Sequence, residues 1–275
     1  AEYLCQQVLG KLHLKATLKS IGLSEKEIAK ALISIAARAI FCASEYKTVQ
    51  LLQSSSELCA CFHYEHAISH KQLYAIADKL HDHKQTMDAQ LYNRITDMFS
   101  ITDKLVIFDI SNTYFETRKS GSEIADFGRS KEKRSDCPIV VFTGVINEAG
   151  FIRHSRIYQG NQGDVATLSD MLLDLEANSP LDKDKTIVID AGIASEENLE
   201  MIKDKGYKYV CVSRKRLKDY PVDPHSITVQ QLTDRDKNKV ELSIFKPEGY
   251  QDTWMYVQSD AKRRKEQSMN AKLHK

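Results

Sequence analysis

Two aspartates stand at the ends of short apolar runs that predict buried β-strands. Asp109 ends the run at 105–109 and Asp190 ends the run at 186–190, and a loop or the start of a helix follows each run. If both runs are neighbouring strands of one sheet, their carboxylates project at the same end of that sheet. A hard divalent cation such as Mg²⁺ takes oxygen ligands and keeps several waters for phosphate chemistry. The pair therefore suggests metal-dependent phosphoryl transfer.

The composition is typical of a soluble globular protein. At 275 residues the chain is long enough for one large domain or two ordinary ones. Hydrophobic residues make up 42% of it and charged residues 28%. No apolar stretch approaches the roughly 20 residues that span a bilayer, and the N-terminus has no signal-peptide layout. Six irregularly spaced cysteines indicate reduced thiols in a cytosolic protein. The net charge of +1 gives no support of its own for nucleic-acid binding.

The order of predicted elements indicates a helical region followed by a mixed α/β domain. Residues 1–100 show helical spacing, with capping boxes at Ser24 to Glu27 and Ser69 to Gln72. Beyond them we expect three strands, a helix beginning at Asp164, a strand, a helix capped by Ser195, and a strand. The first three strands can form an antiparallel meander, and helical crossovers join the last two. The expected strands are 105–110, 139–146, 152–158, 186–189 and 207–212.

Three shorter strand-like runs and a basic helix complete the sequence. The runs are 226–230, 239–245 and 253–257. We therefore expect four parts: a helical N-terminal region at 1–100, an α/β core at 101–214, a β-rich segment at 215–258 and a basic helix at 259–275.

This order of elements is that of the ribonuclease-H-like fold, and the local sequence is similar to a known family. Four successive blocks resemble bacterial insertion-sequence transposases of the DDE type, in the branch with a Tyr-Arg-Glu-Lys signature. The resemblance extends over roughly residues 25 to 265, and four ordered blocks are far more specific than one. The blocks are 108–116, 127–136, 160–168 and 189–198.

The resemblance implies a ribonuclease-H-like mixed sheet with flanking helices, preceded by an all-α region and followed by part of a β-rich insertion. It makes Asp109 and Asp190 the first two catalytic aspartates and the ligands of two Mg²⁺ or Mn²⁺ ions. One ion would activate water or a 3′ hydroxyl, and the other would stabilise the leaving oxygen. The expected partners are double-stranded DNA, as element ends and target, and a second copy of the chain. The expected location is the cytoplasm, at the nucleoid.

The third catalytic carboxylate has no match in the sequence. The Tyr-Arg-Glu-Lys spacing is absent, and the neighbours of Glu266 do not fit it. We expect the missing glutamate beyond Lys275, which would make the chain a C-terminally truncated fragment with an incomplete active site. The alternative is an inactive DNA-binding or dimerising remnant of a transposase. A dehalogenase-like phosphatase is disfavoured, because Ser111 stands where its second aspartate is required.

Five basic residues are candidates for DNA contact. Two, Lys131 and Arg134, fall in a matched block, where a phosphate contact and a surface ion pair with Asp136 are equally good explanations. The other three belong to a basic cluster for which a solvated surface is the plainer explanation. The candidates are Lys131, Arg134, Arg214, Lys215 and Arg216.

Overall fold

The computed structural model describes residues 1–101, 104–116, 121–128, 134–178, 184–213, 227–247 and 249–273. The chain forms two compact units, Ala1–Val212 and Ser213–Lys275. Within the described ranges, no helix combines the length and apolarity needed to cross a membrane. All six cysteines are free thiols.

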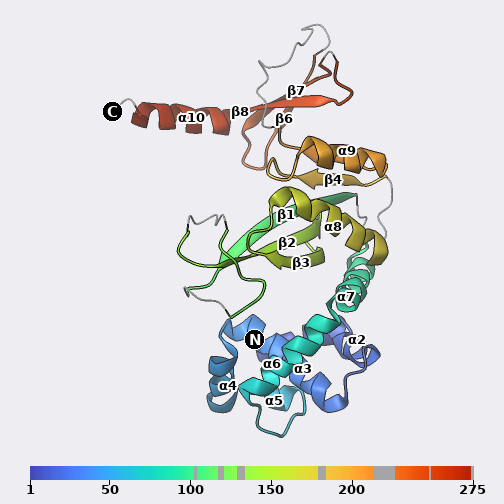
Figure 1. Cartoon of the computed structure of the whole chain (residues 1–275), viewed down its shortest axis with the longest axis vertical. Helices are drawn as coiled ribbons and strands as arrows, with labels where there is room; N and C mark the ends of the chain where they lie inside the picture. The colour runs from blue at the N-terminus through green and yellow to red at the C-terminus, as the bar shows by residue number, and fades with distance from the viewer. Residues whose placement is uncertain are drawn as a thin grey trace. The chain divides into compact units, whose positions relative to one another are not determined.

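The first hundred residues are helical, as predicted (Figure 1). Both predicted capping boxes are present: the backbone N–H of Ser24 donates to Glu27 Oε2 at 2.9 Å, and that of Ser69 donates to Gln72 Oε1 at 2.9 Å. These boxes satisfy N–H groups that a helix start leaves without partners. The helices are α1 (Glu2–Lys11), α2 (Leu14–Ser20), α3 (Glu25–Phe41), α4 (Glu45–Ser54), α5 (Leu58–Cys61), α6 (His70–Asp82) and α7 (Lys84–Phe99).

The capping box of α3 makes a pH-dependent contribution to stability. A hydrogen bond from Lys79 and further bonds from Ser24 lower the pKa of Glu27 from 4.5 to about 2. Because the folded pKa is the lower one, the contribution is complete above pH 4.5 and is lost as the pH falls toward 2. We expect the stability difference between wild type and Glu27→Gln to shrink across this window. Urea unfolding at pH 6, 4 and 2.5 measures it, and a difference independent of pH would contradict the assignment.

The α/β part contains a five-stranded mixed sheet in the order β3-β2-β1-β4-β5. Strands β1, β2 and β3 form an antiparallel meander, whereas β1, β4 and β5 are parallel, as the ribonuclease-H-like order requires. Helices α8 (Asp164–Asn178) and α9 (Glu196–Asp204) provide the crossovers. The strands are β1 (Leu105–Tyr114), β2 (Ile139–Asn147), β3 (Ile152–Gln159), β4 (Thr186–Ile189) and β5 (Lys208–Cys211).

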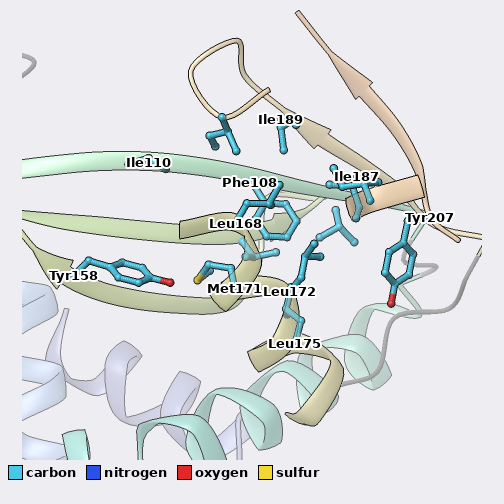
Figure 2. Packing of buried hydrophobic residues seen from close by; sticks show 14 of the residues in the cluster. Phe108, Ile110, Tyr158, Leu168, Met171, Leu172, Leu175, Ile187, Ile189 and Tyr207 are labelled. Carbon is cyan, nitrogen blue, oxygen red and sulfur yellow. The ribbon is translucent and has the colours of Figure 1, made fainter. Parts of the chain in front are cut away.

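One face of this sheet is buried against α8 and α9 (Figure 2). Alternate residues of β1 point into that core, among them Val106 and Phe108, which are 0% and 5% exposed. They pack against buried side chains of α8 that recur at helical spacing and belong to the same cluster (Figure 2): Leu168, Met171, Leu172 and Leu175. The core therefore fixes which face each strand residue occupies.

Strand β1 is longer than predicted. It continues five residues past Asp109 to Tyr114, and the whole of this extension pairs with β2, ending at Tyr114 opposite Ile139. The expectation that a loop follows Asp109 is therefore wrong. The polar stretch Ser111–Thr113 is not apolar enough to predict a strand, but the long apolar run of β2 supplies backbone partners for it.

Two glycines allow the backbone to cross the end of β2 at very short range. A Cβ on Gly160 would lie 2.1 Å from the carbonyl oxygen of Ile139 and 2.4 Å from that of Asp126. A Cβ on Gly128 would lie 2.2 Å from the carbonyl oxygen of Gly160. Asp126 and Ile139 form a β-bridge at this crossing. Two blocks of the sequence resemblance therefore meet at a contact that only glycine permits.

Helix α7 packs on edge strand β3 and joins the helical region to the sheet. Phe99 stacks on Phe151 with ring centroids 5.2 Å apart, and Asn147 Nδ2 donates to the hydroxyl oxygen of Tyr92 at 3.2 Å. The helical region and the sheet accordingly belong to one compact unit.

The second unit contains a three-stranded antiparallel sheet and a helix. The strands are β6 (Thr228–Thr233), β7 (Lys239–Phe245) and β8 (Trp254–Ser259), in the order β6-β7-β8. Helix α10 (Asp260–Leu273) follows β8 directly, and Ser259 Oγ accepts from the backbone N–H of Lys262 at 3.1 Å. The predicted β-rich segment and the basic helix are both present.

Candidate active site

The register of two parallel strands brings the two predicted aspartates together. In the β1–β4 pair, Leu105 lies beside Thr186 and Ile107 beside Val188. Continuing this register by two residues places Asp109 beside Asp190. Asp190 is the first residue after β4, whereas Asp109 lies inside β1. The sequence was compatible with this parallel pairing but did not establish it. The pairing is the reason why the two carboxylates are neighbours.

Both carboxylates lie on the sheet face opposite α8 and α9. Residues level with each other on paired strands point to the same face, and faces alternate along a strand. Phe108 and Ile189 point into the core, at 5% and 3% exposure. Asp109 and Asp190, one residue further along, therefore point away from it, and both are exposed. In the part of the chain that the structure describes, both carboxylates are accessible from solvent.

The carboxylate of Asp190 is held in place by the turn that follows β4. Its Oδ1 accepts hydrogen bonds from the backbone N–H groups of Gly192 at 2.8 Å and Ile193 at 3.1 Å. This turn leads into α9, whose N-cap Ser195 accepts from the backbone N–H of Asn198 at 3.2 Å. One carboxylate oxygen thus has a structural role, and the turn fixes the direction in which the other oxygen points.

Asp109 is held only through its backbone. Nine residue pairs join β1 to β2, and Asp109 lies opposite Gly144 near their middle. Within the described residues, its carboxylate has no hydrogen-bond or ion-pair partner. An exposed carboxylate on a rigid strand, with no basic partner among the described residues, is suited to binding a cation.

The donor set fits a hard divalent ion held by two carboxylates. Mg²⁺ is usually bound through one or two carboxylates, with waters and substrate phosphates completing its shell. Among the residues that the structure describes, no group of three or more His, Cys, Asp or Glu side chains is arranged to hold a metal ion. Glu266, the weak candidate for a third ligand, lies on α10 in the second unit.

The structure gives Arg134 a protein partner. Its Nε and Nη2 donate to the two carboxylate oxygens of Asp136 at 2.8 and 3.0 Å, and the guanidinium lies 4.8 Å from the ring centroid of Tyr114. The hydrogen bonds from Arg134 hold the pKa of Asp136 well below its usual range. The ion pair that the sequence left open is therefore formed. The other DNA-contact candidates, Lys131, Arg214, Lys215 and Arg216, lie outside the described residues.

A partly buried polar network that the sequence did not indicate joins β3 to α8. Asp174 Oδ2 accepts from Arg156 Nη1 at 2.9 Å and lies 3.3 Å from His154 Nε2. Burial, with the nearby charge of Lys84, lowers the pKa of His154, so its imidazole is neutral at pH 7. This network anchors the edge of the sheet and lies on the core face, away from the aspartates.

Gly144 is a neighbour of Asp109 that sequence reasoning missed. It interrupts an apolar strand, Ile139-Val-Val-Phe-Thr-Gly-Val-Ile-Asn147, directly opposite Asp109. The available signal was a glycine inside a strand, which often marks a bulge or the close approach of a ligand. Without the register, its relation to Asp109 could not be known.

The strand order, with a carboxylate on β1 and another directly after β4, defines a ribonuclease-H-like domain. Residues 102–270 match the family model of the transposase DDE domain, and this stretch is more than half of the chain. The chain therefore belongs to the transposase DDE domain family. No curated protein matches it.

Two solved structures show a distant likeness. "Mos1 transposase paired-end complex with left transposon end" is 8% identical, with a TM-score of 0.28, over 68% of this chain and 60% of that one. "Crystal structure of the Mos1 mariner paired end complex with Mn" is 7% identical, with a TM-score of 0.27, over 66% and 57%. The chain thus spans less than two thirds of the length of these proteins. At such scores the likeness carries no argument about function.

Proposed function

We propose that this chain is the DNA-processing core of a bacterial insertion-sequence transposase. Its activity would be the metal-dependent cleavage of DNA at element ends and the joining of those ends to a target. The observation that supports this best is the register of β1 and β4, which sets Asp109 beside Asp190 on one exposed face. The family membership supplies the kind of reaction.

Each of these residues has a part in the proposed chemistry. Asp109 and Asp190 would hold Mg²⁺ or Mn²⁺, two ions in the complete site, and these ions supply a nucleophile and stabilise negative charge on phosphate oxygens. The backbone turn orients Asp190 through Gly192 and Ile193. The β1–β2 ladder holds Asp109 level with it. Double-stranded DNA and a second copy of the chain are the proposed partners, and the nucleoid is the proposed location.

A second candidate is an inactive transposase remnant that binds DNA or dimerises. It is favoured by the finding that, in the described ranges, no third acidic or metal-ligating side chain joins the aspartate pair. The two candidates differ in turnover, because the remnant would bind metal and DNA without cutting. Incubating the chain and Mn²⁺ with an element end, beside a C-terminally extended chain, separates them.

Isosteric replacement of the aspartates tests the site itself. We expect Asp109→Asn and Asp190→Asn each to weaken Mn²⁺ binding by about tenfold or more, because each removes an anionic ligand. Removal of a group that only hydrogen-bonds to a metal ligand already costs about 10–100-fold in affinity. Asparagine can still accept the turn hydrogen bonds at position 190, so the melting temperature should be unchanged. Calorimetric titration with Mn²⁺ measures the affinity.

The matched control is Glu200→Gln, an exposed carboxylate on α9 that should leave Mn²⁺ binding as in the wild type. Wild-type affinity in both aspartate variants would show that the pair is not a metal site.

A further inference from the structure

A row of small and acidic residues crosses the open face of the sheet. Ser155 on β3 lies opposite Gly144 on β2, Gly144 lies opposite Asp109 on β1, and the β1–β4 register continues the row to Asp190. Paired residues share a face, so all four positions belong to the face away from the core. Ser155 and Gly144 therefore lie between the β3 edge of the sheet and the two aspartates.

Bulky apolar side chains border this row on both sides. On one side the residues two positions along are Phe142 and Ile157, which are paired with each other and are 38% and 47% exposed. On the other side are Ile146 and its partner Ile152, the latter 57% exposed. At about 3.4 Å per residue, the backbones of the two borders are roughly 13 Å apart along β2. These borders mark out a strip of the exposed face that ends at the carboxylates, and we call it the β2 trough.

The fold does not require glycine at position 144. Its φ is not in the left-handed region, and an added Cβ would meet one neighbour, Phe142 Cε1, at an ordinary contact distance of 3.6 Å. Gly160, by contrast, would place its Cβ 2.1 Å from a backbone oxygen. A glycine inside a strand costs about 0.5–1 kcal/mol relative to alanine. The β2–β3 register shifts directly afterwards, between Val145 and Ile146, but neither the backbone nor the space at position 144 requires glycine there. We therefore take the missing side chain as room for a ligand that passes close to the strand.

We infer that Gly144 is a positioning residue, which keeps the β2 trough clear so that one sugar–phosphate strand of DNA can reach Asp109 and Asp190. This rests on the function proposed above and names the path of its substrate. Lys84 Nζ donates to the carbonyl oxygen of Ser155 at 2.7 Å, at the β3 end of the row. The paired rows themselves contain no lysine or arginine, so we expect phosphate binding beside Asp109 and Asp190 to depend on the divalent ions that the carboxylates hold.

The test is a size series at position 144 in the full chain, with Gly144→Ala and Gly144→Val. Three quantities are measured: the melting temperature, the affinity for Mn²⁺ alone, and the gain in affinity for a short DNA duplex with a single-stranded overhang when Mn²⁺ replaces EDTA. Gly121→Val is the control, because an added Cβ there meets nothing within 4 Å.

We expect both variants to melt at or above the wild-type temperature and to bind Mn²⁺ within about twofold of wild type, since β-branched residues favour strands and neither carboxylate is altered. The Mn²⁺-dependent gain in DNA affinity should fall tenfold or more in Gly144→Val and by less in Gly144→Ala, while Gly121→Val keeps all of it. The Cβ of alanine makes only an ordinary contact with Phe142. Gly144→Ala therefore still tests whether a side chain at this position lowers DNA affinity, even if valine disturbs the sheet.

Two results would overturn the inference while leaving the proposed function intact. The first is a full Mn²⁺-dependent gain in Gly144→Val. The second is an equal loss of Mn²⁺ affinity and DNA affinity, which would mean that Gly144 shapes the metal site and not the path of the strand. If the wild type binds Mn²⁺ but shows no gain in DNA affinity, the proposed function fails and this inference fails with it.

Discussion

Replacing Gly160 with alanine is expected to destabilise the first unit by about 4 kcal/mol or more, at the upper end of single-substitution effects. The added Cβ would lie 2.1 and 2.4 Å from two backbone carbonyl oxygens, of Ile139 and Asp126. Backbone atoms cannot rotate away as a side chain can, so the β-bridge between these two residues must separate. Chemical denaturation followed by far-ultraviolet circular dichroism measures the loss.

Gly163→Ala is the matched control for this prediction. It lies three residues further on, an added Cβ there has nothing within 4 Å, and its φ is not in the left-handed region. We expect it to change stability by less than about 0.5 kcal/mol. If both variants were equally stable, the close crossing at the end of β2 would not exist in solution.

Truncating Leu172 to alanine should cost about 3 kcal/mol, within the range measured for buried leucines. Leu172 is 0% exposed and lies at the centre of the core between α8 and the sheet, where Figure 2 shows it among Met171, Leu175 and Ile187. The substitution removes apolar contacts and leaves a cavity that a packed sheet and helix fill poorly.

Its neighbour Leu173 provides the control, because it is 54% exposed on the same helix. Leu173→Ala has the same chemistry and the same effect on helix propensity, so the difference between the two variants isolates burial. We expect Leu173→Ala to stay within about 0.5 kcal/mol of wild type in urea unfolding. Equal losses at both positions would contradict the orientation of α8.

Local signals in the sequence predicted most elements well. The strand at 186–189 and the one at 239–245 match β4 and β7 to the residue. The first is a β-branched run, and the second alternates polar with apolar residues. The helix starts at Ser24, Ser69 and Ser195 were predicted from capping chemistry, which depends only on neighbours in the chain. The mixed strand order followed from the order of elements and the handedness of crossovers.

Features that depend on tertiary contact were not predictable. The second half of β1 is polar and is a strand only because β2 pairs with it. Gly128 and Gly160 read as ordinary loop glycines until the crossing of the two loops is known. The bidentate contact between Arg134 and Asp136 could not be chosen over a DNA contact, since both use the same guanidinium.

The residues of the candidate site were predicted from the sequence, but their arrangement was not. Residue types and positions in the chain identified Asp109 and Asp190, but only the register shows that they are level and on one face. Gly144 has no side chain, so no functional group marks it as a candidate site residue in the sequence. Its meaning depends on which residue lies across from it.

The two ladders that flank β1 also set the order in which the site can assemble. The meander of β1, β2 and β3 is built from contacts close along the chain, and nine residue pairs hold β1 to β2. Strand β4 joins β1 through three pairs, from far along the sequence. Contacts between distant segments form late, because a long loop must close first. A nascent chain that has folded only the meander displays Asp109 without Asp190, so under the proposed function we expect metal binding to begin only once β4 has docked on β1.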